Sequence, residues 1–192
     1  NNSITSTFDD TNLATTSRGN VLEVNRLTST DQRLTTNFTY ESHYNQVKTM
    51  TDAMGRVTTF YFDYEEATLG DLNGDNLTNQ ASGNIVKIAY PNVTVGLAAP
   101  QTVVAKFWYN SYGQIIRKID PLGYIDTYEY YTSGASNGYL YRITRDINDK
   151  NISNTFEYDA VGNITKIYDG KGNPTTFEVN ALNQVTKTLA RP

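Results

Sequence analysis

The sequence predicts an all-β fold in which consecutive β-hairpins form one twisted, curved antiparallel sheet. Three observations support this prediction. A short unit, clearest as Tyr158-Asp159-Ala-Val-Gly162, recurs along the 192 residues. Turn signals of the form Asp-x-x-Gly follow one another at intervals that leave strands of about six residues. Aromatic residues alternate with other residues in the strand before each turn. Such a uniform pattern indicates a repeat array.

The first aromatic residue of each unit serves as its anchor. The spacings between anchors are 32, 22, 47, 21, 28 and 21 residues. The spacing of 21 defines the undecorated unit, and the longer spacings indicate inserted loops. Two insertions, at about residues 64–82 and 91–101, account for the spacing of 47. We therefore expect residues 1–192 to form a single array of about six to seven repeats. The anchors are Phe8, Tyr40, Phe62, Tyr109, Tyr130, Tyr158 and, more weakly, Val179.

The turns are predicted from side-chain and backbone chemistry. An Asp side chain accepts hydrogen bonds from the backbone ahead of it, and Gly readily adopts a positive φ. Where Gly is missing, the same position holds Asn45 or Asn183, and Asn tolerates the left-handed conformation better than most residues. The repeated acids are therefore expected to cap their own turns rather than to bind ligands. They are Asp9, Asp63, Asp120, Asp159 and Asp169.

The strand before each turn is predicted to have one buried face. Its two aromatic residues are two positions apart, as in Phe156 and Tyr158, which places both on one face. The residues between such pairs are Thr39, Tyr61, Trp108, Glu129, Glu157 and Glu178. The recurring glutamates are expected to form cross-strand ion pairs with basic residues of neighbouring strands. Those basic residues are Lys87, Lys118, Lys166 and Lys187.

The unit Tyr158-Asp159-x-x-Gly162-Asn163-Ile164, followed by Asp169-x-x-Gly172-Asn173, resembles the YD repeat of the RHS family. Asp120-Pro121-Leu122-Gly123, followed by Thr127-Tyr128-Glu129-Tyr130, is similar to the second half of that repeat. The family includes polymorphic toxins, the C component of insecticidal toxin complexes, wall-associated contact-inhibition proteins and teneurins. The resemblance implies a segment of a larger β-shell, which in the bacterial toxins encloses an effector. Its expected partners are other repeats and an effector domain of the same secreted or surface protein.

Composition excludes several classes of function. The net charge of −4 and the pI near 5.0 argue against nucleic acid and acidic membrane surfaces as partners. No stretch approaches the roughly eighteen apolar residues of a membrane span. Without cysteine the chain itself cannot supply a thiolate zinc site, and with His43 as the only histidine it cannot supply a two-His metal site. We therefore expect no enzymatic activity and no catalytic residues.

One loop suggests a cofactor, calcium. Within residues 71–79, oxygen-bearing side chains occupy loop positions 1, 3, 5 and 9, and position 7 can offer a backbone carbonyl. This resembles the calcium loops of dockerins and EF-hands. Position 6 departs from that pattern because it is Asn76, and position 12 departs because Ser82 cannot supply two carboxylate oxygens. The alternative is a polar surface loop without a metal. The candidate ligands are Asp71, Asn73, Asp75, Leu77 and Asn79.

Three functions compete. The first, which the repeats favour, is a structural segment of a β-shell that encloses or displays an effector domain of the same larger protein. The second is a carbohydrate-binding or cell-surface-binding module that stacks sugars on exposed aromatic rings. Its candidate residues are Trp108, Tyr61 and Tyr112, together with Tyr139 and Tyr141. The third is an enzyme, for which the sequence contains no positive indication. We therefore expect a structural protein.

Overall fold

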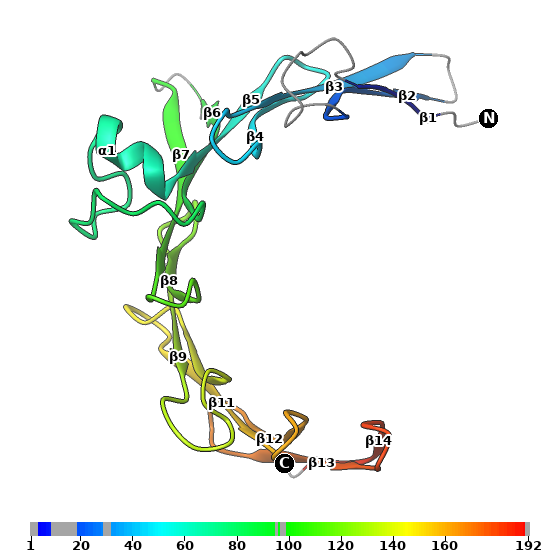
Figure 1. Ribbon diagram of the computed structural model, residues 1–192, viewed down its shortest axis with the longest axis vertical. Helices are drawn as coiled ribbons and strands as arrows, with labels where there is room; N and C mark the ends of the chain where they lie inside the picture. Colours follow the sequence, from blue (N-terminus) through cyan, green and yellow to red (C-terminus); the bar gives the residue numbers. More distant parts are fainter. Residues whose placement is uncertain (1–3, 9–18, 29–31, 95, 97–98, 191–192) are drawn as a thin grey trace. The chain divides into compact units, whose positions relative to one another are not determined.

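The computed structural model confirms the all-β prediction: in the part of the chain that it describes, fourteen strands form one antiparallel sheet, and their order in the sheet follows the sequence (Figure 1). The structure describes residues 4–8, 19–28, 32–94, 96 and 99–190. The strands are β1 Ile4–Phe8, β2 Val21–Leu27, β3 Arg33–Tyr40, β4 Val47–Thr51, β5 Val57–Phe62, β6 Ile85–Val93, β7 Gln101–Tyr109, β8 Ile115–Ile119, β9 Ile125–Tyr130, β10 Leu140–Arg145, β11 Ile152–Tyr158, β12 Ile164–Tyr168, β13 Pro174–Val179 and β14 Val185–Ala190.

The chain packs into two compact units, Asn1–Lys106 and Phe107–Pro192, and each is described by itself. The single array over residues 1–192 stays a prediction. Between β5 and β6 the chain forms a 3-10 turn, η1 (Asp63–Glu65), and one short helix, α1 (Glu66–Leu69). The sequence predicted only a loop there. No helix in the described part of the chain is long and apolar enough to cross a membrane.

Six of the anchors, all except Tyr109, lie at an irregularity in the strand pairing that the sequence did not predict. In the clearest repeat, Glu157 pairs with Lys166 but Tyr158 pairs with Ile164, so Thr165 has no partner across the ladder. A β-bulge of this kind bends the strand and increases its local twist. The anchor Tyr158 thus lies at the bulge. The same register shift occurs at Phe8, Tyr40, Phe62 and Val179, and the strand facing Tyr130 shifts between Leu140 and Arg142.

The anchor tyrosines also form hydrogen bonds across the sheet. The hydroxyl of Tyr158 donates to the carbonyl oxygen of Leu140, the first residue of the preceding strand, at 2.9 Å. Tyr40 donates in the same way to Val21, and Tyr130 to Ile115. Burial raises the pKa of the Tyr158 hydroxyl. The ring therefore packs in the half-buried face while its hydroxyl is satisfied.

The turns have the predicted chemistry. Oδ1 of Asp159 accepts hydrogen bonds from the backbone N–H groups of Val161 and Asn163, at 3.0 and 2.9 Å. These bonds lower the pKa of the Asp159 carboxyl, with the side-chain amide of Asn163 as the largest cause. Asn45 and Asn183 have φ values of 58° and 61°, as their positions predicted. The same side-chain cap forms at Asp52, Asn110, Asp120, Asp169 and Asn180, whereas Asp9 lies outside the described residues.

The exposed face carries cross-strand ion pairs, as predicted. Glu157 pairs with Lys166 at 3.0 Å, and Glu178 pairs with Lys187 at 2.8 Å. Glu129 instead pairs with Arg142. Lys118 pairs with Asp126, and Lys87 lies over the ring of Tyr61 rather than beside a carboxylate. Exposed pairs of this kind contribute at most about 1 kcal/mol each, so they define a face more than they stabilise the fold.

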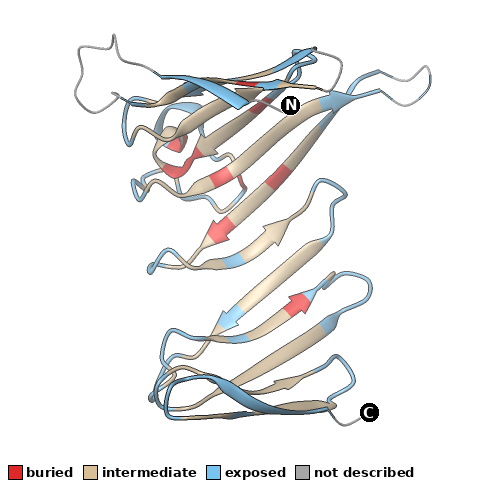
Figure 2. Ribbon diagram, turned by 90° about the vertical axis from the view of Figure 1, so that its right-hand side faces the viewer, coloured by how far each residue is buried: buried red, intermediate tan, exposed pale blue. Residues whose placement is uncertain are grey.

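Buried residues are few among those described, because most of the sheet is a single layer. The large apolar residues with almost no exposed surface in the first unit are Phe62 and Val86, each 1% exposed. They lie near the insertion, where Figure 2 shows several of the buried positions in red. In the second unit Trp108 is 8% exposed. The insertion therefore supplies a local second layer that the undecorated repeats lack.

Two glycine turns in the second unit allow a matched test of this backbone requirement. Gly162 and Gly172 have φ values of 94° and 84°. A Cβ at Gly162 would lie 2.7 Å from the hydroxyl oxygen of Tyr139, whereas a Cβ at Gly172 would meet nothing within 4 Å. We expect Gly172→Ala to lower the free energy of unfolding by about 1 kcal/mol through φ strain alone, and Gly162→Ala by about 2 kcal/mol. Urea denaturation followed by circular dichroism measures both, and equal losses would contradict the role assigned to Tyr139.

Candidate functional site

The insertion after Phe62 replaces a tight turn of the repeat. The backbone N–H of Asp63 donates to the carbonyl oxygen of Asn84, just as Asp159 donates to Asn163 in the clean repeat. Asn84 therefore occupies the position of Asn163, and residues 64–82 are extra to the repeat. The insertion starts and ends at two paired strands, which hold its two ends together.

The side chain of Asp63 closes the base of the insertion. This side chain is completely buried, with its residue 0% exposed. Its Oδ1 accepts from the N–H groups of Tyr64 and Gly83 at 2.8 and 2.9 Å, and its Oδ2 accepts from Ser82 at 3.1 Å. Asp159 accepts from a backbone N–H four residues ahead, whereas Asp63 accepts from backbone N–H groups nineteen and twenty residues ahead. The expected turn role thus holds at Asp63, on a longer loop.

Further contacts fix the insertion on the first unit. Glu65 accepts from the backbone N–H of Phe62 and forms a salt bridge of 2.6 Å with Lys48 of β4. Lys106 of β7 reaches the carbonyl oxygen of Asn73 at 3.4 Å. The ring of Tyr64 stacks on Phe62, with centroids 5.7 Å apart. His43, at the turn after β3, also stacks on the ring of Tyr64, with centroids 4.7 Å apart, so its observed contact is packing.

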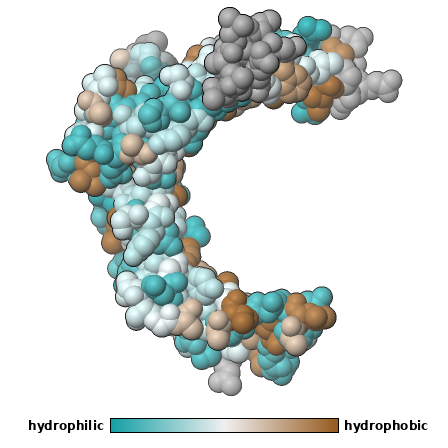
Figure 3. Space-filling view, in the orientation of Figure 1, coloured by the Kyte–Doolittle hydropathy of each residue, from teal (hydrophilic) through white to brown (hydrophobic). Residues whose placement is uncertain are grey.

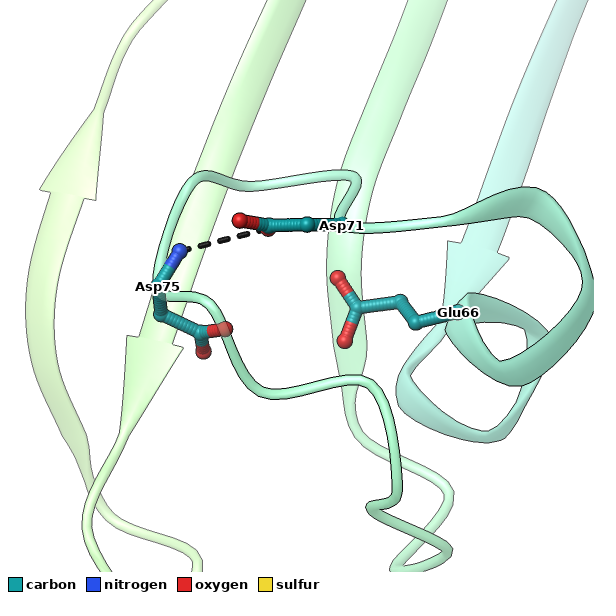
Figure 4. Close-up of side chains that lie close together, drawn as sticks. All are labelled: Glu66, Asp71 and Asp75. Atoms are coloured by element: carbon teal, nitrogen blue, oxygen red, sulfur yellow. Dashed lines mark hydrogen bonds between the residues drawn. The ribbon is translucent and has the colours of Figure 1, made fainter.

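Three carboxylates meet inside this insertion. Glu66 of α1, Asp71 and Asp75 each place a carboxylate oxygen within 4.8 Å of the others. Figure 4 shows the Glu66 side chain extending from the helix toward the two loop aspartates. Glu66 is 1% exposed, Asp75 is half-buried and Asp71 is exposed. The cluster is therefore open to solvent on the Asp71 side and closed on the Glu66 side.

The structure separates the candidate calcium ligands into two groups. Asp71 and Asp75 lie together, and the buried side chain of Asn73 contacts Asp75, accepting from its N–H at 3.0 Å. Leu77 and Asn79 have exposed side chains. The backbone N–H of Ser82, at position 12, donates to Oδ2 of Asp63. Sequence reasoning missed Glu66 because this residue precedes the loop, and only the turn of α1 directs it back.

The pKa values of Asp71 and Glu66 are shifted in opposite directions. The backbone N–H groups of Asn76 and Gly74 lower the pKa of Asp71. Burial raises the pKa of Glu66 and the charges of Asp75 and Asp71 raise it further, whereas hydrogen bonds from the backbone N–H groups of Leu72 and Asn73 lower it. One oxygen of Glu66, Oε1, accepts from the N–H of Leu72, whereas Oε2 is buried without a hydrogen-bond partner. Among the described residues, no Lys, Arg or His forms an ion pair with any of the three carboxylates.

The aromatic residues considered for sugar stacking lie in different surroundings. The guanidinium of Arg117 covers the ring of buried Trp108, with its central carbon 4.6 Å from the centroid. Tyr61 is half-buried, and Lys48 and Lys87 lie over its ring at 4.3 and 5.2 Å. Tyr112, at the tip of a turn, is 86% exposed. Cation–π contacts thus occupy two of the three rings.

No protein-family model matches the sequence, and no curated protein matches it either. Solved structures do. A crystal structure of TcdB2-TccC3-Cdc42 matches with 18% identity and a TM-score of 0.63, over 92% of this chain and 9% of that chain. A crystal structure of TcdB2-TccC3 without its hypervariable C-terminal region matches with the same identity, TM-score and coverage. The structure of the Photorhabdus luminescens Tc holotoxin pore matches with 18% identity and a TM-score of 0.62, over 88% of this chain and 8% of that chain.

The matches confirm the resemblance at the level of the fold. The sheet of consecutive antiparallel hairpins is the architecture of the RHS-repeat shells in these toxin-complex structures. The chain spans about a tenth of the length of the chains that it matches. At 18% identity the likeness extends to the fold and not to activity or partners.

Proposed function

We propose that this chain is a non-catalytic structural segment of an RHS/YD-repeat β-shell, which encloses an effector domain of a larger secreted or surface toxin-like protein. The observation that carries the proposal is the sheet itself. The fourteen strands of the described residues pair in sequence order, so the sheet can be extended at either end by further hairpins of the same kind. A shell is built by such extension.

The two outer strands support this reading. β1 and β14 each pair on one side only, and all of their residues are exposed. They carry large apolar side chains, including Ile4, Phe8 and Leu189, at 68%, 53% and 48% exposed. Figure 3 shows apolar side chains gathered at the β14 end of the second unit. Open, apolar strand edges favour pairing with another strand, and neighbouring repeats of a longer chain would provide one.

Limited proteolysis of the intact parent protein tests the proposal. We expect one segment outside the repeats to resist cleavage while the repeats are folded and to be cut rapidly after denaturation, because the shell excludes the protease. Mass spectrometry of the products identifies that segment. The Phe62→Ala variant of the parent, which weakens the sheet, should expose the same segment, whereas Tyr112→Ala at an exposed turn should leave it protected.

The opposite result is equally clear. If the repeats resist cleavage while every other segment is cut at the same rate before and after denaturation, the shell encloses nothing and the proposal fails. The chain would then be a display scaffold. On the described residues no observation favours sugar stacking over this structural role, so the shell is the function proposed.

A further inference from the structure

The Glu66 side chain has an arrangement that the shell does not require. Its residue is 1% exposed, and Oε2 is buried without a hydrogen-bond partner. The side chain extends toward Asp71 and Asp75, and all three offer carboxylate oxygens within 4.8 Å of one another (Figure 4). The undecorated repeat has no counterpart, because Glu66 belongs to the insertion.

Burial of an ionised carboxylate is costly unless the charge is paired or bound to a metal. None of the described basic residues forms an ion pair with this cluster, and Lys106 contacts the carbonyl oxygen of Asn73 rather than a carboxylate of the cluster. Two further carboxylates lie beside Glu66, and their like charges add repulsion to the cost of burial. A cation at the cluster would remove both costs and would give Oε2 a partner.

The chemistry of the donors selects the class of cation. All three side chains are carboxylates, and hard divalent cations prefer oxygen ligands. The donors come from a short helix and a loop, and one of them is exposed, so the geometry is irregular. Ca²⁺ accepts irregular sites of six to eight oxygens including water, whereas Mg²⁺ demands a near-ideal octahedron.

We propose that Glu66, Asp71 and Asp75 bind Ca²⁺, with Glu66 supplying from α1 the acidic ligand that position 12 of the loop lacks. Bound there, the ion connects the helix to residues 71–75 and holds the insertion closed over β5 and β6. Ser82 is free of that role and instead closes the base of the insertion through Asp63. The proposal does not depend on what the shell encloses.

Isothermal titration calorimetry of the whole chain with CaCl₂, after treatment with EDTA and its removal, tests the proposal. We expect one site with a Kd on the order of 10⁻⁴–10⁻³ M, in the range of extracellular calcium modules. Glu66→Gln keeps the shape and the Oε1 acceptor but removes the charge, so it should weaken binding by about tenfold or more. The matched control, Glu178→Gln, changes an exposed glutamate of the second unit and should bind as the unaltered chain does.

Thermal melting separates loss of binding from loss of folding. In EDTA the Glu66→Gln variant should melt at or above the temperature of the unaltered chain, since a buried charge has been removed. In saturating CaCl₂ the unaltered chain should gain roughly 5 °C, and the variant should gain almost nothing. Asp71→Asn should behave as Glu66→Gln does. Absence of a binding isotherm at millimolar Ca²⁺, or Glu66→Gln binding with unchanged affinity, would overturn the proposal.

Discussion

Replacing Phe62 by alanine is expected to lower the free energy of unfolding of the first unit by about 3–5 kcal/mol. Phe62 is 1% exposed, and its ring stacks on Tyr64 with an angle of 3° between the planes. It also follows the bulge at which β5 shifts register against β6. Truncation leaves a cavity between the sheet and the insertion, and neither layer can collapse to fill it because the paired strands hold both in place.

Urea denaturation followed by far-ultraviolet circular dichroism measures this loss. Fluorescence of Trp108 is a poor probe here, since that residue belongs to the second unit. Tyr112→Ala is the control: the ring is 86% exposed, and its loss should change the free energy of unfolding by no more than about 0.5 kcal/mol. A loss below 1 kcal/mol at Phe62 would mean that the anchor does not contribute to the core.

Replacing Asp63 by alanine is expected to cost about 2–3 kcal/mol and to loosen the insertion. The carboxylate accepts three backbone hydrogen bonds, two of which come from Ser82 and Gly83 at the far end of the insertion. Hydrogen bonds to a charged group contribute about 1.5–3 kcal/mol, and the loss is reduced where water reaches the abandoned N–H groups, as at exposed Ser82. The sheet remains paired, so the damage should be local.

Two measurements distinguish this local effect from general destabilisation. Denaturation gives the change in free energy, and limited proteolysis gives the rate of cleavage within residues 70–82, which should rise. Asp169→Ala is the matched control, because Asp169 caps an ordinary exposed turn through the N–H groups of Lys171 and Asn173. It should cost at most about 1 kcal/mol. Equal losses of stability at the two positions would show that the burial of Asp63 does not increase its contribution to the free energy of unfolding.

Much of the fold could be predicted because the repeat signals are local. Asp159 and Gly162 define a turn through bonds within four residues, and the alternation of Phe156 and Tyr158 defines a strand face. Six or seven copies make such weak signals decisive. The bulges at the anchors were not predictable in this way, since a register shift depends on the partner strand, and no residue type marks it.

The candidate site shows the same division. Its loop acids, Asp71 and Asp75, were identified from spacing alone. Glu66 was not, because it lies five residues before the loop and joins the other two only when α1 turns it inward. The sequence also did not show how exposed the aromatic rings are. Trp108 and Tyr61 occupy positions equivalent to the exposed Glu129, yet cations from adjacent strands cover their rings.

The sequence by itself determined the hairpins, their turns and their order, because those depend on contacts between residues a few positions apart. Tertiary structure alone decided where the sheet gains a second layer, which anchor becomes fully buried and which acids converge. Those outcomes depend on how the insertion of residues 64–82 folds back on β4 to β7, through Asp63, Glu65 and Asn73. Contacts of that range leave no periodic trace in the sequence, since only one repeat carries them.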